Sequence, residues 1–442
     1  MPRPPNILFI LTDQLSARAL GAAGHPDIAT PNIDRIARRG VRFTNAHCAA
    51  PVCTPSRTTL LTGRMPHEVG INTNDDPFDP ALVRLGHDFR AAGYETAHAG
   101  RWYLTHPDPV GNAHGFEFLP FATTPRTDYL GADTDSLTAD AAIAFLRRPH
   151  PQPFLLWVSL FNPHDICHVV GHNEVVPRSE AEGPSLPLNF PRDPYEPEFI
   201  QDCRRRSHYG NEQNQTRDWT LDHWRGYLHA YHRLVETVDV QVGRVLDALE
   251  AQGLADDTLI VFTSDHGEGM AAHHWVVKLM LYQEVVNVPL IFAGAGINTP
   301  GQTDDQHLAS GVDVLPTLCD FAGVQSTSPC SGQSLRPVLN DPSLPGRPFV
   351  VSELQPDTHD ATRMGRMLRT PRFKYIAFSY GRDPEMLFDL QTDPGETRNL
   401  ASLPAHDSTR LELRALLQGW IARTADRFVL PAGNTVSASP TP

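Results

Sequence analysis

The sequence predicts an α/β fold with a large, mostly parallel or mixed sheet between helices, followed by a small antiparallel sheet with one helix. Up to about residue 330, apolar runs bounded by turn signals alternate with helical patterns, as in sheets covered by helices on both faces. Beyond that point, short alternating runs follow one another closely and precede a single amphipathic helical pattern. The 442 residues, 40% hydrophobic and 20% charged, have an ordinary globular composition that suits one large domain and a smaller one.

The strand candidates of the large sheet are short apolar runs. They lie at 6–12, 94–99, 154–161, 258–264 and 288–293. Helical patterns lie between them, at 31–39, 136–147 and about 219–251. Because ligands bind at the carboxyl ends of the strands in such sheets, the polar residues that follow these runs are the candidate site.

The predicted catalytic domain covers 1–330 and contains one stretch, 166–218, that is rich in Pro, His and charge with little periodicity. We expect this stretch to be a long loop or insertion on the substrate side. A C-terminal subdomain is expected over 331–430, with strands at 348–353, 366–370, 373–379 and 386–390 and a helix at 409–425. The tail 431–442 is predicted to be disordered.

The charge balance excludes several classes of partner. A net charge of −14 disfavours nucleic acid and anionic membranes, so an anionic substrate needs a local cluster of metal and basic residues. The five-residue apolar run at 7–11 is too short for a signal peptide or membrane span, and six irregularly spaced Cys form no disulfide framework. We therefore expect a cytoplasmic protein, and the sequence leaves its oligomeric state open.

The stretch 53–64 reads as the start of a buried helix. Pro55 suits the first helical turn, where its missing N–H has no intrahelical partner to lose. Cys53 is thus predicted at a helix N-terminus with Arg57 one turn on, where the dipole and the cation lower a thiol pKa.

The string from Cys53 to Arg64, with its Cys-x-Pro-Ser-Arg start, resembles the signature of the type I sulfatases, which have the alkaline-phosphatase-like fold. Matches at 30–46, a helix and strand of that family, and at 387–400 extend the likeness over nearly the whole chain. The resemblance implies that Cys53 is oxidised to formylglycine by a formylglycine-generating enzyme. It also implies that the hydrated aldehyde is the nucleophile.

Two pairs of potential ligands follow separate strands: Asp13-Gln14 and Asp265-His266. Oxygen donors at a strand end suit a hard metal ion. The resemblance implies one divalent metal bound by both pairs together with Cys53, with Ca²⁺ expected and Mn²⁺ as the alternative that tolerates imidazole. Gln14 and His266 replace the commoner Asp and Asn and look like the choline sulfatase and phosphonate monoester hydrolase branch.

The remaining site residues are also implied by the resemblance. Gly100 to Thr105 occupies the place of the family's Gly-Lys-Trp-His-Leu-Gly, and His164 follows a strand as the family's Pro-His does. Lys278 matches a second sulfate-binding Lys, ahead of the run that begins at Val288. Catalytic roles are implied for Arg57, Arg101, Tyr103, His164 and Lys278, and substrate-side roles for Asn74 and Thr105.

The activity that this resemblance implies is hydrolysis of a sulfate monoester, either small or borne on a carbohydrate, through a covalent sulfated hemiacetal at position 53. Arg57, Arg101 and Lys278 would hold the anion and stabilise the transition state, and His164 would protonate the leaving alcohol. A phosphonate monoester or phosphodiester hydrolase of the same fold is the nearest alternative. A catalytically silent protein that binds sulfated glycan is the alternative from another class.

Overall fold

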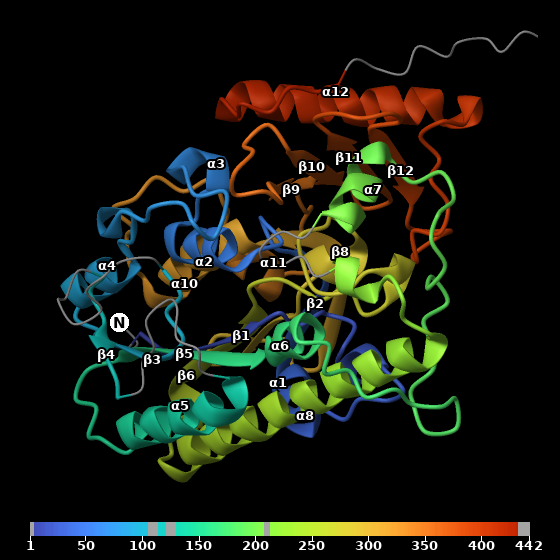
Figure 1. Ribbon diagram of the computed structural model, residues 1–442. Helices are drawn as coiled ribbons and strands as arrows, with labels where there is room; N and C mark the ends of the chain where they lie inside the picture. The colour runs from blue at the N-terminus through green and yellow to red at the C-terminus, as the bar shows by residue number, and fades with distance from the viewer. Residues whose placement is uncertain (1–3, 105–113, 121–129, 207–212, 432–442) are drawn as a thin grey trace, which may run out of the picture.

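The computed structural model describes residues 4–104, 114–120, 130–206 and 213–431. Its central feature is a large sheet with helices on both faces (Figure 1). A second, smaller sheet lies to one side under the C-terminal helix. Within the described residues, no helix is both long and apolar enough to cross a membrane.

The large sheet contains eight strands within the described residues, in the order β4-β3-β5-β1-β6-β7-β2-β8. Strand β7 is antiparallel to both of its neighbours, and the other pairs are parallel. The strands are β1 (Asn6–Asp13), β2 (Gly40–His47), β3 (Glu95–Gly100), β4 (Glu117–Phe118), β5 (Phe154–Pro163), β6 (Thr258–Ser264), β7 (Leu290–Gly294) and β8 (Gln302–Ser310).

The central strands are buried on both faces, which explains their continuous apolar sequences. Along β1, Ile7 and Phe9 pack into the core on one face, whereas Leu8 and Ile10 pack into the core on the other. Phe9 stacks on Trp157 of β5 with ring centroids 3.9 Å apart. Burying every side chain of β1 holds its carboxyl end in a rigid frame, and that end carries site residues.

Helices α1, α5 and α8 cover one face of the sheet, and α2, α4 and α10 lie on the other (Figure 1). Helix α8 packs against both α5 and α1 and also contacts β5. The α-helices of the described residues are α1 (Pro31–Arg38), α2 (Cys53–Thr62), α3 (Pro66–Val69), α4 (Leu85–Ala91), α5 (Gly131–Leu146), α6 (Asp165–Gly171), α7 (Glu198–Arg205), α8 (Leu221–Ala251), α9 (Gln283–Val286), α10 (Val314–Ala322), α11 (Arg336–Asn340) and α12 (Asp407–Thr424).

The small sheet is antiparallel throughout, in the order β12-β11-β10-β9, and α12 lies along it (Figure 1). Its strands are β9 (Val350–Leu354), β10 (Gly365–Arg369), β11 (Phe373–Phe378) and β12 (Glu385–Asp389). Leu413 and Leu417 of α12 pack with Leu368 and Tyr375 in a core of their own. Side chains also tie this part to the first: His67 bonds Glu353 of β9 at 2.6 Å.

The predicted fold class is confirmed, and the structure adds elements that the apolar pattern did not indicate. Strand β8 has the polar sequence Gln-Thr-Asp-Asp-Gln-His-Leu-Ala-Ser and forms a sheet edge with an exposed first half. Within the stretch predicted as a loop, α6, α7 and a 3₁₀ turn at Gln213–Thr216 form, so the longest irregular run among its described residues is 172–197. These helices are each eight residues or shorter, too brief to show a clear period. The predicted disordered tail falls outside the described residues after Pro431.

Candidate active site

Two parallel strands bring the two predicted ligand pairs together. Strands β1 and β6 are neighbours in register, with Thr12 opposite Ser264. Asp13 ends β1 and Asp265 directly follows β6, and the Asp265 N–H donates to the Thr12 carbonyl at 3.1 Å. The two carboxylates, 252 positions apart in the chain, therefore lie at one edge of the sheet, as the strand-end argument predicted.

Helix α2 places the sulfatase-like string above this edge. It begins at Cys53, every one of its ten residues is buried, and the Asn74 Oδ1 accepts the Thr54 N–H at 2.8 Å, supplying a cap from outside the helix. The Ser56 hydroxyl donates to the Asp265 carbonyl oxygen. The Ser of the string therefore fastens the helix to the strand end that carries the ligands.

Arg57 orients both carboxylates. Its Nη2 bonds Asp13 Oδ2 at 3.0 Å, and its Nε bonds Asp265 Oδ2 at 2.8 Å. Its Nη1 donates to the Arg101 carbonyl and the Ser159 hydroxyl, both at 2.9 Å. The resemblance to the type I sulfatases implies that Arg57 holds the sulfate. A guanidinium that is 2% exposed and directed at four protein oxygens instead favours a role in positioning the ligands.

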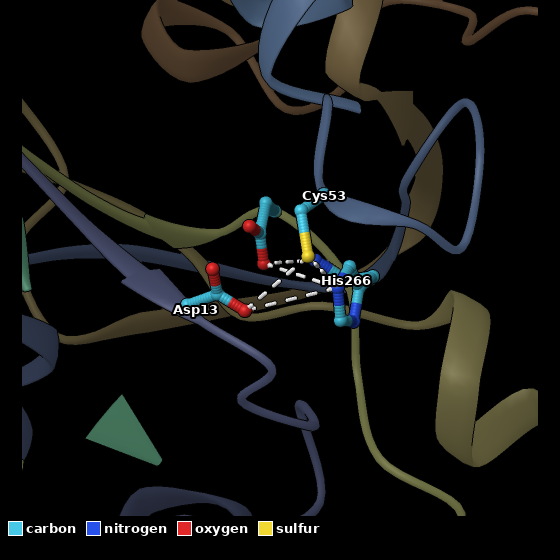
Figure 2. A group of neighbouring side chains, drawn as sticks. Asp13, Cys53 and His266 are labelled. Carbon is cyan, nitrogen blue, oxygen red and sulfur yellow. Dashed lines mark hydrogen bonds and ion pairs between the residues drawn. The ribbon is translucent and has the colours of Figure 1, made fainter. Parts of the chain in front are cut away.

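The other carboxylate oxygens face a common point. Asp13 Oδ1 lies 3.8 Å from the Cys53 sulfur and 3.8 Å from His266 Nε2, and Figure 2 shows these three side chains directed toward one another. His266 Nδ1 lies 2.9 Å from the Gly267 carbonyl. Because a carbonyl only accepts, this contact assigns the proton to Nδ1 and leaves the Nε2 lone pair facing the cluster.

The four predicted ligands Asp13, Cys53, Asp265 and His266 are fully buried, and one potential ligand atom from each lies within 4.8 Å of the others. Two carboxylate oxygens and one imidazole nitrogen around a buried point fit a divalent cation, because these are the ligand types that such ions take in proteins. The structure therefore brings these four residues together as a candidate metal site.

Gln14, the fifth predicted ligand, is held by residues that the sequence analysis did not single out. Its Nε2 donates to Glu268 Oε2 at 2.5 Å, and its amide also contacts the Cys167 sulfur at 3.2 and 3.3 Å. The second oxygen of Glu268 accepts from the Tyr227 hydroxyl and the Val277 N–H. Glu268 thus links a predicted ligand to the loop before Lys278. Its position as the one carboxylate in the Gly267-Glu268-Gly269 turn was the available signal.

Lys278 is the cation nearest to the proposed nucleophile position: its Nζ lies 3.1 Å from the Cys53 sulfur. Burial and the Asp13 carboxylate both act to raise the pKa of Cys53, but Lys278 and His266 outweigh them and lower it. Burial likewise acts against the charge of Lys278, while Cys53 holds the pKa of Lys278 well above its ordinary value. The site therefore favours negative charge at position 53.

Arg101 adds a second fixed cation. Its Nη1 lies 2.9 Å from Asp13 Oδ2, and its guanidinium lies between the rings of Tyr103 and Phe161, 3.9 Å from each centroid. Burial acts to raise the pKa of Asp13, but Arg101 and the other nearby cations hold that pKa well below its usual value. Tyr103 thus packs against a cation at the site.

His164 follows β5 and is half-buried. Burial and the nearby Lys278 and Arg101 lower its pKa well below the ordinary value, so its imidazole is neutral in the free site. Asn74 has its Oδ1 committed to the α2 cap, and its Nδ2 is buried without a hydrogen-bond partner among the described residues. Thr105, predicted on the substrate side, lies outside the described residues. The roles assigned to these three residues stay predictions.

A second group of potential ligands, His273, Glu284 and Glu396, already has cationic partners. Arg18 pairs with Glu284 at 2.7 Å, and Lys374 pairs with Glu396 at 2.6 Å. These ion pairs account for both carboxylates, so the cluster around Cys53 is the stronger metal candidate.

A buried ligand cluster joined to fixed cations at the strand ends of an α/β sheet fits an enzyme that acts on a small anionic ester. The family described as Sulfatase matches residues 5–324, and the one described as N-sulphoglucosamine sulphohydrolase, C-terminal, matches 271–422. The chain belongs to the sulfatase family, and it is a sulfuric ester hydrolase.

Three comparisons place the chain within that family. The Delta 4,5-hexuronate-2-O-sulfatase of Bacteroides thetaiotaomicron is 36% identical over 445 residues, covering 96% of this chain and 90% of the relative. The structure of a 2-O GAG sulfatase is 33% identical with a TM-score of 0.83, covering 97% of this chain and 95% of that one. A phosphonate monoester hydrolase from Silicibacter pomeroyi is 25% identical with a TM-score of 0.79, each chain being covered to 96%. The phosphonate hydrolase is thus the more distant neighbour.

Proposed function

We propose that this protein removes a sulfate group from a carbohydrate sulfate ester, with formylglycine at position 53 and one divalent metal. The observation that carries the proposal is the convergence on Cys53 of a fixed cation, Lys278 at 3.1 Å, and of the ligand atoms of Asp13, Asp265 and His266. The choice of substrate class is supported by the relatives of higher identity, whose names describe them as sulfatases of a hexuronate and of a GAG.

The metal of this proposal is Ca²⁺, with Mn²⁺ as the alternative. Asp13, Asp265, His266 and position 53 would hold it, together with the Gln14 amide oxygen. Carboxylate oxygens favour a hard ion, whereas the His266 nitrogen makes Mn²⁺ competitive. When bound, the metal supplies Lewis-acid stabilisation of the sulfate charge and favours ionisation of an attacking hydroxyl.

Formylglycine suits position 53 because its hydrate offers two hydroxyl groups on one carbon. One hydroxyl releases its proton to solvent, and its oxygen forms the new bond to sulfur as the bond between sulfur and the ester oxygen breaks. The second hydroxyl then loses its proton, the bond from that carbon to the sulfate oxygen breaks, and the aldehyde returns. Addition of one water molecule to the aldehyde restores the hydrate. A plain thiol or hydroxyl has no second hydroxyl with which to expel sulfate in this way.

The charged side chains of the site divide the remaining work. Lys278 and Arg101 stabilise the charge that develops on the transferring sulfate group. Burial and the nearby cations lower the pKa of His164, and the bound sulfate offsets those cations, so His164 takes up a proton from solvent and donates it to the leaving oxygen. The neutral imidazole that remains can accept the proton of the second hydroxyl. Arg57 acts through the carboxylates that it orients.

The test is a comparison of kcat/KM on three kinds of substrate: a sulfated uronic acid or amino sugar, a nitrophenyl sulfate and a phenyl phosphonate ester. Metal-loaded enzyme, made with a formylglycine-generating enzyme, should prefer the sulfates. Preferred turnover of the phosphonate ester would favour the alternative hydrolase. Absence of turnover with both sulfates, in enzyme whose position 53 is shown by mass to be formylglycine, would favour the silent binding protein.

A further inference from the structure

A second polar cavity lies between the large sheet and the small one. Its volume is about 310 Å³, at the lower end of small-molecule sites, and it shares no lining residue with the cluster around Cys53. Three arginines line it: Arg18 after β1, Arg42 in β2 and Arg369 in β10. None of the described residues that line it is acidic.

Arg369 is the deepest of these cations and lacks a full set of partners. Arg369 is only 5% exposed. Its Nη2 donates to Asn45 Oδ1 at 3.3 Å. Its Nε and Nη1 have no hydrogen-bond partner among the described residues. Glu396 is the acid that acts on Arg369, but its carboxylate is already paired with Lys374 at 2.6 Å. A buried guanidinium with unpaired donors is unfavourable unless something binds there.

Of the two other arginines, Arg18 has an ion-pair partner and Arg42 does not, so the side chains that line the cavity carry a net positive charge. Arg18 is neutralised by Glu284 at 2.7 Å and also donates to the Pro394 carbonyl at 2.6 Å. Arg42 has no ion pair among the described residues and makes only a long contact, 3.5 Å, with the Thr303 hydroxyl. Burial lowers the pKa of Arg369 to about 10 and also lowers that of Arg42. Both shifts have the same main cause, burial of a cation, which outweighs the opposing charges of Glu396 on Arg369 and of Asp34 on Arg42.

From this cavity we infer that the protein has a second anion site, in which Arg369 and Arg42 bind a sulfate or phosphate group away from the catalytic centre. Guanidinium groups match such oxyanions in charge and in hydrogen-bond geometry. The anion can arrive free or attached to a small sugar. The inference does not rest on the proposed catalytic activity, because it uses none of the catalytic residues.

The first test locates the anion directly. Crystals of the metal-loaded protein are soaked in selenate, which has the shape and charge of sulfate and scatters anomalously. A selenium peak within hydrogen-bonding distance of the Arg369 side chain supports the inference. Selenate found at Lys278 but absent from the Arg369 cavity at saturating concentration overturns it.

The second test measures binding by calorimetry with inorganic sulfate and inorganic phosphate. Arg369→Gln and the more exposed Arg42→Gln should each weaken anion binding at the Arg369 cavity about tenfold or more, because each removes a charged hydrogen bond to the anion. Lys278→Ala should leave anion binding at this cavity unchanged. Arg382→Gln, which removes an 82% exposed charge of the C-terminal subdomain, is the matched control.

Equal binding by wild type, Arg369→Gln and Arg42→Gln overturns the inference, whatever the fate of the catalytic activity. Tighter binding of glucose 6-phosphate than of inorganic phosphate, lost in Arg369→Gln, supports the site and identifies its ligand as an anion carried on a sugar. Tighter binding of the inorganic ion, lost in the same variant, supports it as a site for the free anion. Circular dichroism of each variant verifies that it is folded.

Discussion

The Lys278 ammonium nitrogen lies 3.1 Å from the Cys53 sulfur, although 225 positions separate these residues in the chain. Both side chains are buried. The Lys278 carbonyl accepts the Trp275 indole N–H at 3.0 Å, and the preceding Val277 N–H donates to Glu268. The loop is thus fixed at two points beside the lysine. A cation held this firmly at position 53 can act on charge as it develops, without having to move first.

Cys53 is expected to be formylglycine in active enzyme. Peptide mass spectrometry of protein made with and without a formylglycine-generating enzyme measures the modified fraction, and the specific activity should rise in proportion to it. Cys53→Ala, which cannot be modified, should be inactive and serves as the control. Full activity in protein whose position 53 is entirely cysteine would rule out the modified residue as the nucleophile.

Removal of the metal should abolish activity and lower the melting temperature. The ligand atoms of Asp13, Asp265 and His266 lose the cation that they share, and an ion at about 100 times its Kd contributes about 2.7 kcal/mol to stability. Activity, metal content and melting are measured before and after chelation, then after addition of Ca²⁺ or Mn²⁺. Asp265→Asn should bind the ion more weakly in the same assay. Unchanged activity after the metal content has fallen to zero would contradict the site.

His164→Ala and Lys278→Ala should respond differently to the leaving group. A general acid typically contributes about 10²–10⁴-fold, and most when the departing oxygen is basic, so His164→Ala should slow sugar sulfates far more than nitrophenyl sulfate. Lys278→Ala should slow both similarly, by about 10²–10³-fold, because a fixed charge serves every substrate. The measurement is kcat/KM over a series of graded leaving groups.

His172→Ala, an exposed change just after α6, is the control for the histidine series. If His164→Ala slows all the substrates equally, His164 is not the acid. A residue of the 166–218 stretch would then be the next to test.

Glu268→Gln should weaken metal binding and activity by about 10- to 100-fold, as losing an outer hydrogen-bond partner of a ligand typically does. The carboxylate accepts from the Gln14 amide at 2.5 Å and from the Gly269 N–H at 2.9 Å, besides Tyr227 and Val277. The side-chain amide of a glutamine would place its own N–H groups against one of these donors, and that donor would lose its acceptor. The readouts are the metal Kd and kcat.

Tyr227→Phe is the matched variant for Glu268, because it removes one donor and keeps the carboxylate. Its effect should be the smaller of the two. A Glu268→Gln enzyme with wild-type metal affinity and kcat would show that Glu268 has no part in positioning Gln14.

His67 should make stability depend on pH. Burial acts to lower its pKa, but the hydrogen bond to Glu353 at 2.6 Å and the charge of Glu353 raise it above 6.5. A raised pKa means that the folded protein holds the proton more tightly than the unfolded chain does. The stabilisation is therefore full below about pH 6.5 and is lost as the pH rises through the folded-state pKa.

The measurement is the melting temperature of wild type and His67→Gln between pH 5.5 and 9. Glutamine keeps a polar side chain without the charge, so the difference between the two proteins should be largest at the acidic end and shrink as the pH rises. A difference that stays constant with pH would show that His67 contributes by packing against Trp420 and not through its charge.

Several features followed from the sequence itself. The apolar runs of β1, β5 and β6 indicated strands because each is buried on both faces, which requires continuous hydrophobic residues. The polar pairs that end at Asp13 and begin at Asp265 marked the ligand edge, since parallel strands present their carboxyl ends together. The Cys-x-Pro-Ser-Arg string indicated the family by its resemblance to a known signature. In the structure its residues form the start of α2 and bond to the strand end beside it.

Other features depended on contacts between distant parts of the chain. The polar strand β8 forms because β2 offers it a free edge, and local sequence carries no sign of that partner. The resemblance implied a place for Arg57 on the sulfate, and the structure adds that its hydrogen bonds go to protein oxygens, among them those of the two aspartates. Glu268 accepts hydrogen bonds both from Tyr227 of α8 and from Val277 of the loop before Lys278. Such roles arise because a buried polar group must satisfy its hydrogen bonds with whatever the fold brings near, and only the tertiary structure decides what that is.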